Sequence, residues 1–443
     1  MPLKIYKINL SPPSRAVLMM AELLKLNYVT QDVDLMAGEH KSPDYLEKNP
    51  MHTVPVLEDG DFLLADSHAI IIYLVSKYGG GQQSKLYPSD LKLRATINQR
   101  LFFETSNVAG AAREVVLGIM TGQSAPTANQ IENLNDAYGI LEKYLQKTKY
   151  VAANHLTIAD VSLVAGISSI NVLVPVDAKY TRVHAWWNSL KEEDWYKNGW
   201  LLPGTEDKHC LLLTSIDTVN MPIKIYKIDS SPPARVCVII AELLKLDYTT
   251  QDVNLMAGEH LTPEYLDKNP MHTVPVLEDG DFVLADSHAI MTYLISKYGT
   301  TELQEKLYPS DLQIRATINQ RMFFETANII SVAREIVYAL MSGKEAPTEK
   351  QIENMNDGYS ILEKYLEKTK FVACDHFTIA DLSLGAVISS TNVYVPVDAK
   401  YVKIHAWWNL LKEEDWYKNM NQPGLTQYEV WIKSMMKSKS DSA

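Results

Sequence analysis

Two short polar pairs stand where a helix is expected to begin, and they are the first residues that could do chemistry. Asp66-Ser67 precedes an apolar run, and Asp286-Ser287 stands in the same setting further along the chain. Free N–H groups and the positive end of a helix dipole attract a carboxylate at such a start, while the aspartate attracts an ammonium group. Each pair could therefore bind an amino-acid zwitterion. The alternative is that each pair only caps its helix.

The elements that position these pairs recur almost unchanged, since residues 49–70 are repeated at residues 269–290. Alternating apolar residues around a Glu-Asp-Gly-Asp turn predict a hairpin, and the apolar run after it predicts a helix. In the first copy these elements are expected as a buried strand at 54–57, a tight turn at 58–61, a second strand at 62–65, and a helix that begins at Ser67 and ends at 78.

The whole chain consists of two copies. Pro2 aligns with Pro222, an offset of 222 − 2 = 220, and Asp160 aligns with Asp381, an offset of 381 − 160 = 221. This period is too long for a solenoid, so each copy is expected to have its own core. We expect an N-terminal domain at 1–80, a C-terminal domain at 88–198, a linker at 199–220, a second N-terminal domain at 221–300 and a second C-terminal domain at 309–443.

Each copy is predicted to be α/β at its start and all-α afterwards. The first part reads as βαβ followed by ββα, which gives a mixed four-stranded sheet. Its remaining elements are strands at 3–8 and 28–33, a helix at 13–26, and a short helix or turn at 43–48. After residue 88 only helical patterns remain, at 91–120, from 126 or 127 to 145, from 157, at 180–191 and, in copy 2 alone, at 428–437. Thr157 and Asp160 form a variant of the capping box, which we interpret as structural.

The composition excludes several classes of function. The formal net charge is −12 and the pI is near 5.4, so no basic surface is expected for nucleic acid or an anionic membrane. Three cysteines without paired spacing predict neither a disulfide framework nor a metal site. No apolar signal segment precedes the first strand, and the apolar run at 161–176 is interrupted by polar residues and proline. A cytoplasmic protein is expected.

Four motifs together resemble the glutathione transferases, most closely the insect delta and epsilon classes. They cover both copies in the expected order and, in copy 1, are residues 10–15 (LSPPSR), 49–57 (NPMHTVPVL), 66–70 (DSHAI) and 157–160 (TIAD). The resemblance implies a thioredoxin-like N-terminal domain and an all-helical C-terminal domain in each copy. It also implies glutathione as co-substrate, with the thiol activated by the serine after the first strand, Ser11 or Ser231. Each serine, taken alone, reads equally as an N-cap before proline.

The resemblance implies further glutathione contacts in each copy. The residue before a cis proline pairs its backbone with the cysteinyl part, the Asp-Ser pair holds the γ-glutamyl end, and two histidines lie near the glycyl carboxylate. Asp66 stands where many relatives have glutamate, and each histidine alone reads as a solvated loop residue. The implied glutathione-binding residues are His40, His52, Val54, Pro55, Asp66 and Ser67 in copy 1, and His260, His272, Val274, Pro275, Asp286 and Ser287 in copy 2.

The resemblance also implies an acceptor pocket and a dimer contact. The expected pocket residues lie on the long fourth helix of each copy and differ between copies: Ala109, Arg113 and Leu117 against Ile330, Arg334 and Tyr338. For Arg113 the alternative is an ion pair with Glu114. His68 and His288 match a position at the two-fold interface of these classes. The halves are expected to pair either within one chain, as a pseudo-dimer, or between two chains.

These expectations describe an enzyme with two sites per chain that conjugates glutathione to hydrophobic electrophiles in detoxification. Two alternatives stay open. One is a glutathione-dependent isomerase or dehydrochlorinase, and the other is a non-catalytic protein that binds ligands on the same fold. The sequence does not identify the acceptor, the relative activity of the copies, the way the halves pair or the role of the linker.

Overall fold

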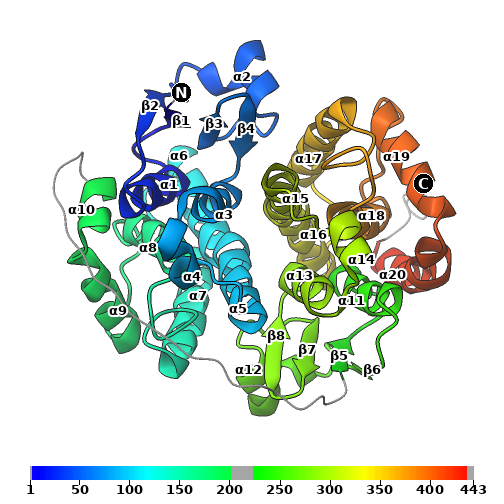
Figure 1. Ribbon diagram of the computed structural model, residues 1–443. Coiled ribbons are helices and arrows are strands. Elements are labelled where there is room, and N and C mark those ends of the chain that lie inside the picture. Colours follow the sequence, from blue (N-terminus) through cyan, green and yellow to red (C-terminus); the bar gives the residue numbers. More distant parts are fainter. Residues whose placement is uncertain (1, 201–222, 437–443) are drawn as a thin grey trace. The chain divides into compact units, whose positions relative to one another are not determined.

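The computed structural model describes residues 2–200 and 223–436, and the chain divides into two compact units, Met1–Met221 and Pro222–Ala443. Each unit holds one four-stranded sheet followed by helices (Figure 1). None of the described helices is long and apolar enough to cross a membrane. The expected linker lies outside the described residues except for Gly199 and Trp200, which end a helix.

The sheet of unit 1 confirms the predicted mixed topology. Its strands are β1 (Leu3–Lys7), β2 (Tyr28–Asp32), β3 (Val56–Asp59) and β4 (Phe62–Ala65), in the spatial order β2-β1-β3-β4. The pair β1 and β2 is parallel, whereas β3 is antiparallel to both β1 and β4. Unit 2 repeats this sheet with β5 (Ile223–Lys227), β6 (Tyr248–Asp252), β7 (Val276–Asp279) and β8 (Phe282–Ala285).

The hairpin strand β3 begins two residues later than predicted. Val54 and Pro55 lie before the strand, because Pro55 has no N–H group to donate to a neighbouring strand. The strand instead extends through Glu58 and Asp59, which pair with Leu63 and Phe62. The turn therefore shrinks from four residues to two, and Gly60 occupies the left-handed region with φ 67°.

The helices of the N-terminal domain of unit 1 are α1 (Pro12–Leu23), η1 (Glu39–Lys41), α2 (Pro43–Lys48), α3 (Ser67–Tyr78), η2 (Gly80–Gln82) and α4 (Gln83–Leu86). Those of the C-terminal domain are α5 (Leu91–Phe103), η3 (Glu104–Ala109), α6 (Gly110–Met120), α7 (Ala128–Lys147), α8 (Ile158–Ile170), α9 (Thr181–Lys191) and α10 (Asp194–Trp200). The predicted helix at 91–120 is thus interrupted by a π-helical segment. α10 was not predicted, and Gly199 allows it to pack closely on Met19 of α1.

Among the described residues, unit 2 repeats most of these helices, has no counterpart of η2 and adds α20 (Gln422–Met435). In its N-terminal domain these are α11 (Pro232–Leu243), η4 (Glu259–Leu261), α12 (Pro263–Lys268), α13 (Ser287–Tyr298) and α14 (Thr301–Leu307). In its C-terminal domain they are α15 (Leu312–Phe324), η5 (Glu325–Ile330), α16 (Ser331–Met341), α17 (Glu349–Lys368), α18 (Ile379–Thr391), α19 (Val402–Glu413), η6 (Tyr417–Asn421) and α20 (Gln422–Met435). α20 is the helix predicted only for copy 2, and it begins earlier than expected.

A buried aspartate holds the core of each helical domain together. Asp160, near the start of the almost fully buried helix α8, accepts hydrogen bonds from Thr157 N, Val151 N and Trp186 Nε1 at 2.8, 2.9 and 2.9 Å. Thr157 caps α8 in a capping box with Asp160, as predicted. Asp381 makes the same three contacts in unit 2, to Thr378, Val372 and Trp407. Each helical domain therefore contains its own buried aspartate with the same three hydrogen bonds.

Candidate functional site

Three segments of each N-terminal domain meet at one edge of its sheet. Tyr6 near the end of β1 pairs with Val56 at the start of β3, and Val56 pairs on its other side with Ala65 at the end of β4. The loop after β1, the residues before β3 and the start of α3 therefore leave the sheet at the same edge. This register gathers Ser11, Val54-Pro55 and Asp66-Ser67, and the sheet of unit 2 repeats it.

Ser11 and Ser231 both cap the helix that follows the first strand. Ser11 Oγ accepts a hydrogen bond from Ser14 N at 3.3 Å, and Ser231 Oγ accepts one from Ala234 N at 3.4 Å. Both serines are half-buried, and each precedes prolines in the first helical turn. Each hydroxyl accepts from its own helix, so its proton can be donated elsewhere.

The helix α3 begins at Ser67, as predicted, and Asp66 is the residue of the pair that caps it. Asp66 Oδ1 accepts hydrogen bonds from His68 N at 2.9 Å and Ala69 N at 3.0 Å. Its backbone has φ 72°, a conformation that costs energy for a residue with a side chain and that often occurs at functional sites. Ser67 becomes the first helical residue, and its N–H is not among those that the capping carboxylate accepts. Asp286 caps α13 in the same way.

A buried cluster behind this capping aspartate contains an imidazole and a second carboxylate. His68 Nε2 lies 3.0 Å from Glu104 Oε2, and His68 Nδ1 lies 3.6 Å from Asp66 Oδ1. Burial disfavours the protonated imidazole, but hydrogen bonds and charges of Asp66 and Glu104 outweigh this and raise the pKa of His68 to about 10. The imidazole is therefore protonated at neutral pH, and it links α3 to the helical domain.

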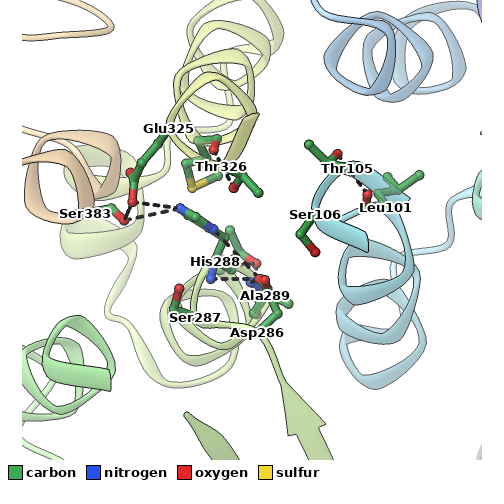
Figure 2. Close-up of polar contacts among 12 residues, drawn as sticks. Leu101, Thr105, Ser106, Asp286, Ser287, His288, Ala289, Glu325, Thr326 and Ser383 are labelled. Carbon is green, nitrogen blue, oxygen red and sulfur yellow. Dashed lines mark hydrogen bonds and ion pairs between the residues drawn. The ribbon is translucent and has the colours of Figure 1, made fainter. Parts of the chain in front are cut away.

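In copy 2 the cluster includes a serine, Ser383 (Figure 2). His288 Nε2 lies 3.5 Å from Glu325 Oε1 and 3.2 Å from Ser383 Oγ, and Ser383 donates a hydrogen bond to Glu325 at 2.9 Å. Burial lowers the pKa of His288, but the effects of Glu325 and Asp286 raise it by more than burial lowers it. The pKa of His288 therefore lies above its usual value. The contacts of His68 and His288 described here lie within their own units, and their expected role at a dimer interface stays a prediction.

The sequence analysis missed Glu104 and Glu325, although they complete these clusters. Each is the first residue of a π-helical segment, η3 or η5, and is less than a tenth exposed. π-helical turns frequently occur at functional sites. A signal was present in the sequence, because both copies have glutamate directly after two phenylalanines. A charged residue in that setting needs a buried partner.

The paired histidines of each copy lie near each other. The ring centroids of His40 and His52 are 6.3 Å apart, and those of His260 and His272 are 6.4 Å apart. Burial, with smaller contributions from Lys41 and His52, lowers the pKa of His40. His40 is therefore neutral at pH 7 and can act as a hydrogen-bond donor or acceptor without a full charge.

The peptide bonds Val54–Pro55 and Val274–Pro275 are both cis, as the resemblance implied. Val54 is 9% exposed, and the following strand residue Val56 is fully buried. Two side chains also hold this segment, because Tyr45 Oη and Asn49 Nδ2 each donate a hydrogen bond to Thr53 O at 2.8 Å. The backbone before the proline is thus held in place by the helix α2 and by the asparagine that ends it.

The expected acceptor residues share one face of a helical stretch. Positions four residues apart lie on the same side of a helix. Arg113 and Leu117 are exposed on α6, whereas Arg334 is half-buried and Tyr338 is exposed on α16; Ala109 and Ile330, which end η3 and η5, are half-buried. Glu114, the alternative partner of Arg113, accepts a hydrogen bond from Asn133 Nδ2 at 3.1 Å.

Family models match four segments of the chain. The description "Glutathione S-transferase, N-terminal domain" applies to residues 10–77 and 225–302. The description "Glutathione S-transferase, C-terminal domain" applies to residues 111–194 and 317–415. Each unit therefore carries both parts of this family in the same order.

Two curated relatives of the chain are insect proteins. Glutathione S-transferase 1 of Manduca sexta is 40% identical over 46% of this chain and 94% of its own length, and glutathione S-transferase D7 of Drosophila melanogaster is 33% identical over 45% and 87%. A solved epsilon-class glutathione S-transferase from the housefly, Musca domestica, is 39% identical over 48% of this chain and 98% of its own, with a TM-score of 0.46. Each relative thus matches about half of this chain. The chain belongs to the glutathione S-transferase family and contains two copies of its fold in tandem.

Proposed function

We propose that the chain is a glutathione transferase with one active site in each copy, which conjugates the glutathione thiolate to hydrophobic electrophiles. The observation that carries this proposal is the repeated edge of the sheet, where a serine hydroxyl, a cis proline and an aspartate-capped helix start come together in both units. The proposed catalytic residues are Ser11 and Ser231. We further propose a cytoplasmic enzyme, because the free thiols of Cys237 and Cys374 fit a reducing compartment.

The serine hydroxyl is proposed to donate a hydrogen bond to the glutathione sulfur. A thiolate is the reactive nucleophile, whereas a free thiol with a pKa of about 8.5 is mostly protonated at neutral pH. A hydroxyl donor and the N-terminus of α1 or α11 both favour the negative charge on sulfur. Lowering the thiol pKa by roughly two units would raise the ionised fraction about tenfold or more.

The γ-glutamyl end of glutathione is proposed to bind at the start of α3 and α13. The α-carboxylate would accept from the N–H and hydroxyl of Ser67, because the capping aspartate accepts from the next two N–H groups and leaves the first one. The ammonium group would lie against the carboxylate of Asp66. Ser287 and Asp286 have the same roles in copy 2. His40 and His52, with His260 and His272, are proposed to face the glycyl carboxylate.

The acceptor is proposed to bind beside the face of α6 or α16 that carries Arg113 or Arg334. The two faces differ in size and polarity, because Leu117 is matched by Tyr338 and Ala109 by Ile330. The two sites are therefore proposed to prefer different electrophiles. With an aryl halide, the sulfur lone pair forms the new C–S bond, the halide leaves with the electrons of its bond to carbon, and the thiol proton passes to water.

The test is conjugation of glutathione to a generic aryl halide by the wild type, Ser11→Ala, Ser231→Ala and the double variant. We expect each single variant to retain the activity of the other copy and the double variant to lose about 100-fold, as when one donor to a developing anion is removed. Glutathione binding, measured by calorimetry, should survive in all four proteins.

Two outcomes would replace this proposal. If glutathione is bound but not conjugated by any of the four proteins, while a glutathione-dependent isomerisation or dehydrochlorination proceeds, the chain is an isomerase or dehydrochlorinase. If it binds glutathione and apolar ligands without turnover of any kind, the chain is a carrier. Activity that persists in the double variant would show that the serines do not activate the thiol.

A further inference from the structure

A buried arginine holds the loop that carries Ser231. Arg235 lies on α11 four residues after Ser231 and is 4% exposed. Its Nη1 donates hydrogen bonds to the carbonyl oxygens of Asp229 and Ser230, at 3.3 and 3.1 Å. Because a peptide unit is planar, the carbonyl of Ser230 and the N–H of Ser231 move together. The arginine therefore fixes the orientation of the peptide that enters Ser231.

The other side of the same guanidinium is bound to the helical domain. Arg235 Nη2 donates to Ser390 Oγ at 2.7 Å and to Ala386 O at 3.4 Å, both on α18. Its Nε donates to Asn421 Oδ1 at 3.0 Å, and Asn421 is fully buried at the start of α20. Burial lowers the pKa of Arg235 to about 10, so the group stays charged at neutral pH. One side chain thus connects the serine loop, α18 and the C-terminal segment.

The backbone of α20 packs on the same loop. A Cβ atom on Gly424 would lie 2.4 Å from Asp229 O and 2.6 Å from Arg235 Cδ, so only glycine fits there without displacing the loop. The side chain of Asp229 accepts a hydrogen bond from Lys227 Nζ at 2.7 Å on the opposite side. The loop before Ser231 is therefore enclosed between β5 and α20.

Copy 1 has the arginine and part of its surroundings, since Asn9 and Ser169 are the counterparts of Asp229 and Ser390. Arg15 is half-buried. Its Nε donates a hydrogen bond to Asn9 O at 2.7 Å, and its Nη1 donates one to Ser169 Oγ at 3.0 Å. With the offset of 221 that relates the helical domains, 421 − 221 = 200 and 424 − 221 = 203, so Trp200 and Pro203 stand at the positions of Asn421 and Gly424. The asparagine amide of copy 2 is therefore not encoded in copy 1, whereas a Pro-Gly pair, Pro203-Gly204, occurs one position later than Pro423-Gly424.

We propose that Arg235 and Asn421 are positioning residues for Ser231, through which the segment that begins α20 sets the strength of thiol activation in copy 2 alone. The proposal rests on the proposed function, because it assumes that Ser231 donates to the glutathione sulfur. A loop that rotates away lengthens that hydrogen bond without removing any group that contacts glutathione. The expected signature is therefore a change in thiol acidity and turnover, with glutathione binding largely retained.

The experiment uses the full chain with Ser11→Ala, so that copy 2 alone reports. Into it we introduce Asn421→Ala, Gly424→Ala and, separately, Arg235→Lys, which keeps a charge but loses the forked donors. Asn419→Ala is the matched control, because Asn419 is an exposed asparagine two residues away. The readouts are kcat and KM with an aryl halide, and the pH dependence of the ultraviolet absorbance of the bound thiolate.

We expect Asn421→Ala and Gly424→Ala each to raise the pKa of bound glutathione by about one unit and to lower kcat at neutral pH by about tenfold. KM for glutathione should stay within about twofold, and Asn419→Ala should match its parent. Arg235→Lys should shift the same two quantities in the same direction. Should Arg235→Lys fail to fold, as judged by circular dichroism, Asn421→Ala and Gly424→Ala still decide the question.

The results separate this inference from the function on which it rests. If the variants lower the melting temperature but leave the thiol pKa and kcat unchanged, Arg235 and Asn421 are only structural and the inference is wrong. If the double variant Ser11→Ala, Ser231→Ala is as active as the Ser11→Ala parent, the proposed function is wrong instead. The inference is also wrong if Arg15→Lys, tested with Ser231→Ala, shifts the thiol pKa of copy 1 as strongly as Arg235→Lys shifts that of copy 2.

Discussion

The serine loops of the two copies have the same backbone but different support. Ser11 has φ −78° and ψ 117°, and Ser231 has φ −80° and ψ 116°. Behind Ser231 lies a buried guanidinium bound to Asn421, whereas Trp200 stands at the position of Asn421 in copy 1. The short motif that contains the serine therefore sets the shape of the loop. Residues nearly 200 positions away in sequence set how firmly it is held.

The buried histidine clusters show the same contrast. His68 and Glu104 form a direct pair at 3.0 Å, whereas His288 and Glu325 lie 3.5 Å apart and both bind Ser383. The histidine and glutamate are the same residue types in both copies, but the distance between them differs, and in copy 2 both also contact Ser383. Motifs thus indicate which groups meet, and the packing around them determines the strength of each contact.

The largest expected effect tests whether the two helical domains are truly equivalent. Asp160→Ala and Asp381→Ala should each destabilise their own unit by about 3–5 kcal/mol, because each leaves three buried N–H groups without an acceptor. Urea denaturation followed by hydrogen exchange of peptides from each unit would measure this. A loss confined to one of the two variants would break the equivalence of the two helical domains.

The second prediction uses pH to distinguish the histidine clusters. The folded pKa of His68 is about 10 and the unfolded one is about 6.5, so the stabilisation is complete below 6.5 and is lost as pH rises through 10. Glu104→Gln should therefore cost unit 1 about 2 kcal/mol at pH 6.5, and the difference from the wild type should shrink towards pH 10. Denaturant titrations at several pH values would measure it.

Glu325→Gln is the matched variant in unit 2. It should cost less than Glu104→Gln, because the His288 contact is longer and Ser383 remains as a partner of the imidazole. Equal costs in the two units would show that the shared hydroxyl does not change the strength of the cluster. A cost of Glu104→Gln that grows with pH would contradict the assigned protonation of His68.

The smallest expected effect concerns acceptor preference. Leu117→Tyr in a chain with Ser231→Ala, and Tyr338→Leu in a chain with Ser11→Ala, should exchange the preferences of the two copies. We expect changes in kcat/KM of about fivefold between small and large aryl electrophiles, near the low end for pocket residues because both side chains are exposed. Unchanged ratios would show that these positions do not contact the acceptor.

Much of the fold followed from the sequence because the signals are local. The alternation of strands, the prolines after Ser11 and the capping box at Thr157 each act within a few residues. The helix start at Ser67 was predicted, but the capping residue was not, since an aspartate and a serine in succession are both good caps and only the backbone conformation decides between them. The shift of β3 follows from the missing N–H of Pro55.

The interactions that hold the candidate site together could not be predicted in the same way. The contact between Arg235 and Asn421 joins residues 186 positions apart, and that between His68 and Glu104 joins two domains. No local propensity encodes such pairs. In one sequence, the only indication of them was that the same residues recur in both copies. The helix α10 (Asp194–Trp200) was missed as well, because the linker was expected to begin at 199, inside its last turn.

The position shared by Leu117 and Tyr338 has a further consequence. In an enzyme assembled from two identical chains, any substitution near the acceptor enters both active sites at once. In this chain the two positions are encoded separately, so one site can change its preference while the other keeps its own. Every molecule nevertheless contains both proposed sites in a fixed one-to-one ratio. Tandem duplication thus allows each proposed site to mutate independently, while both are still produced together in every chain.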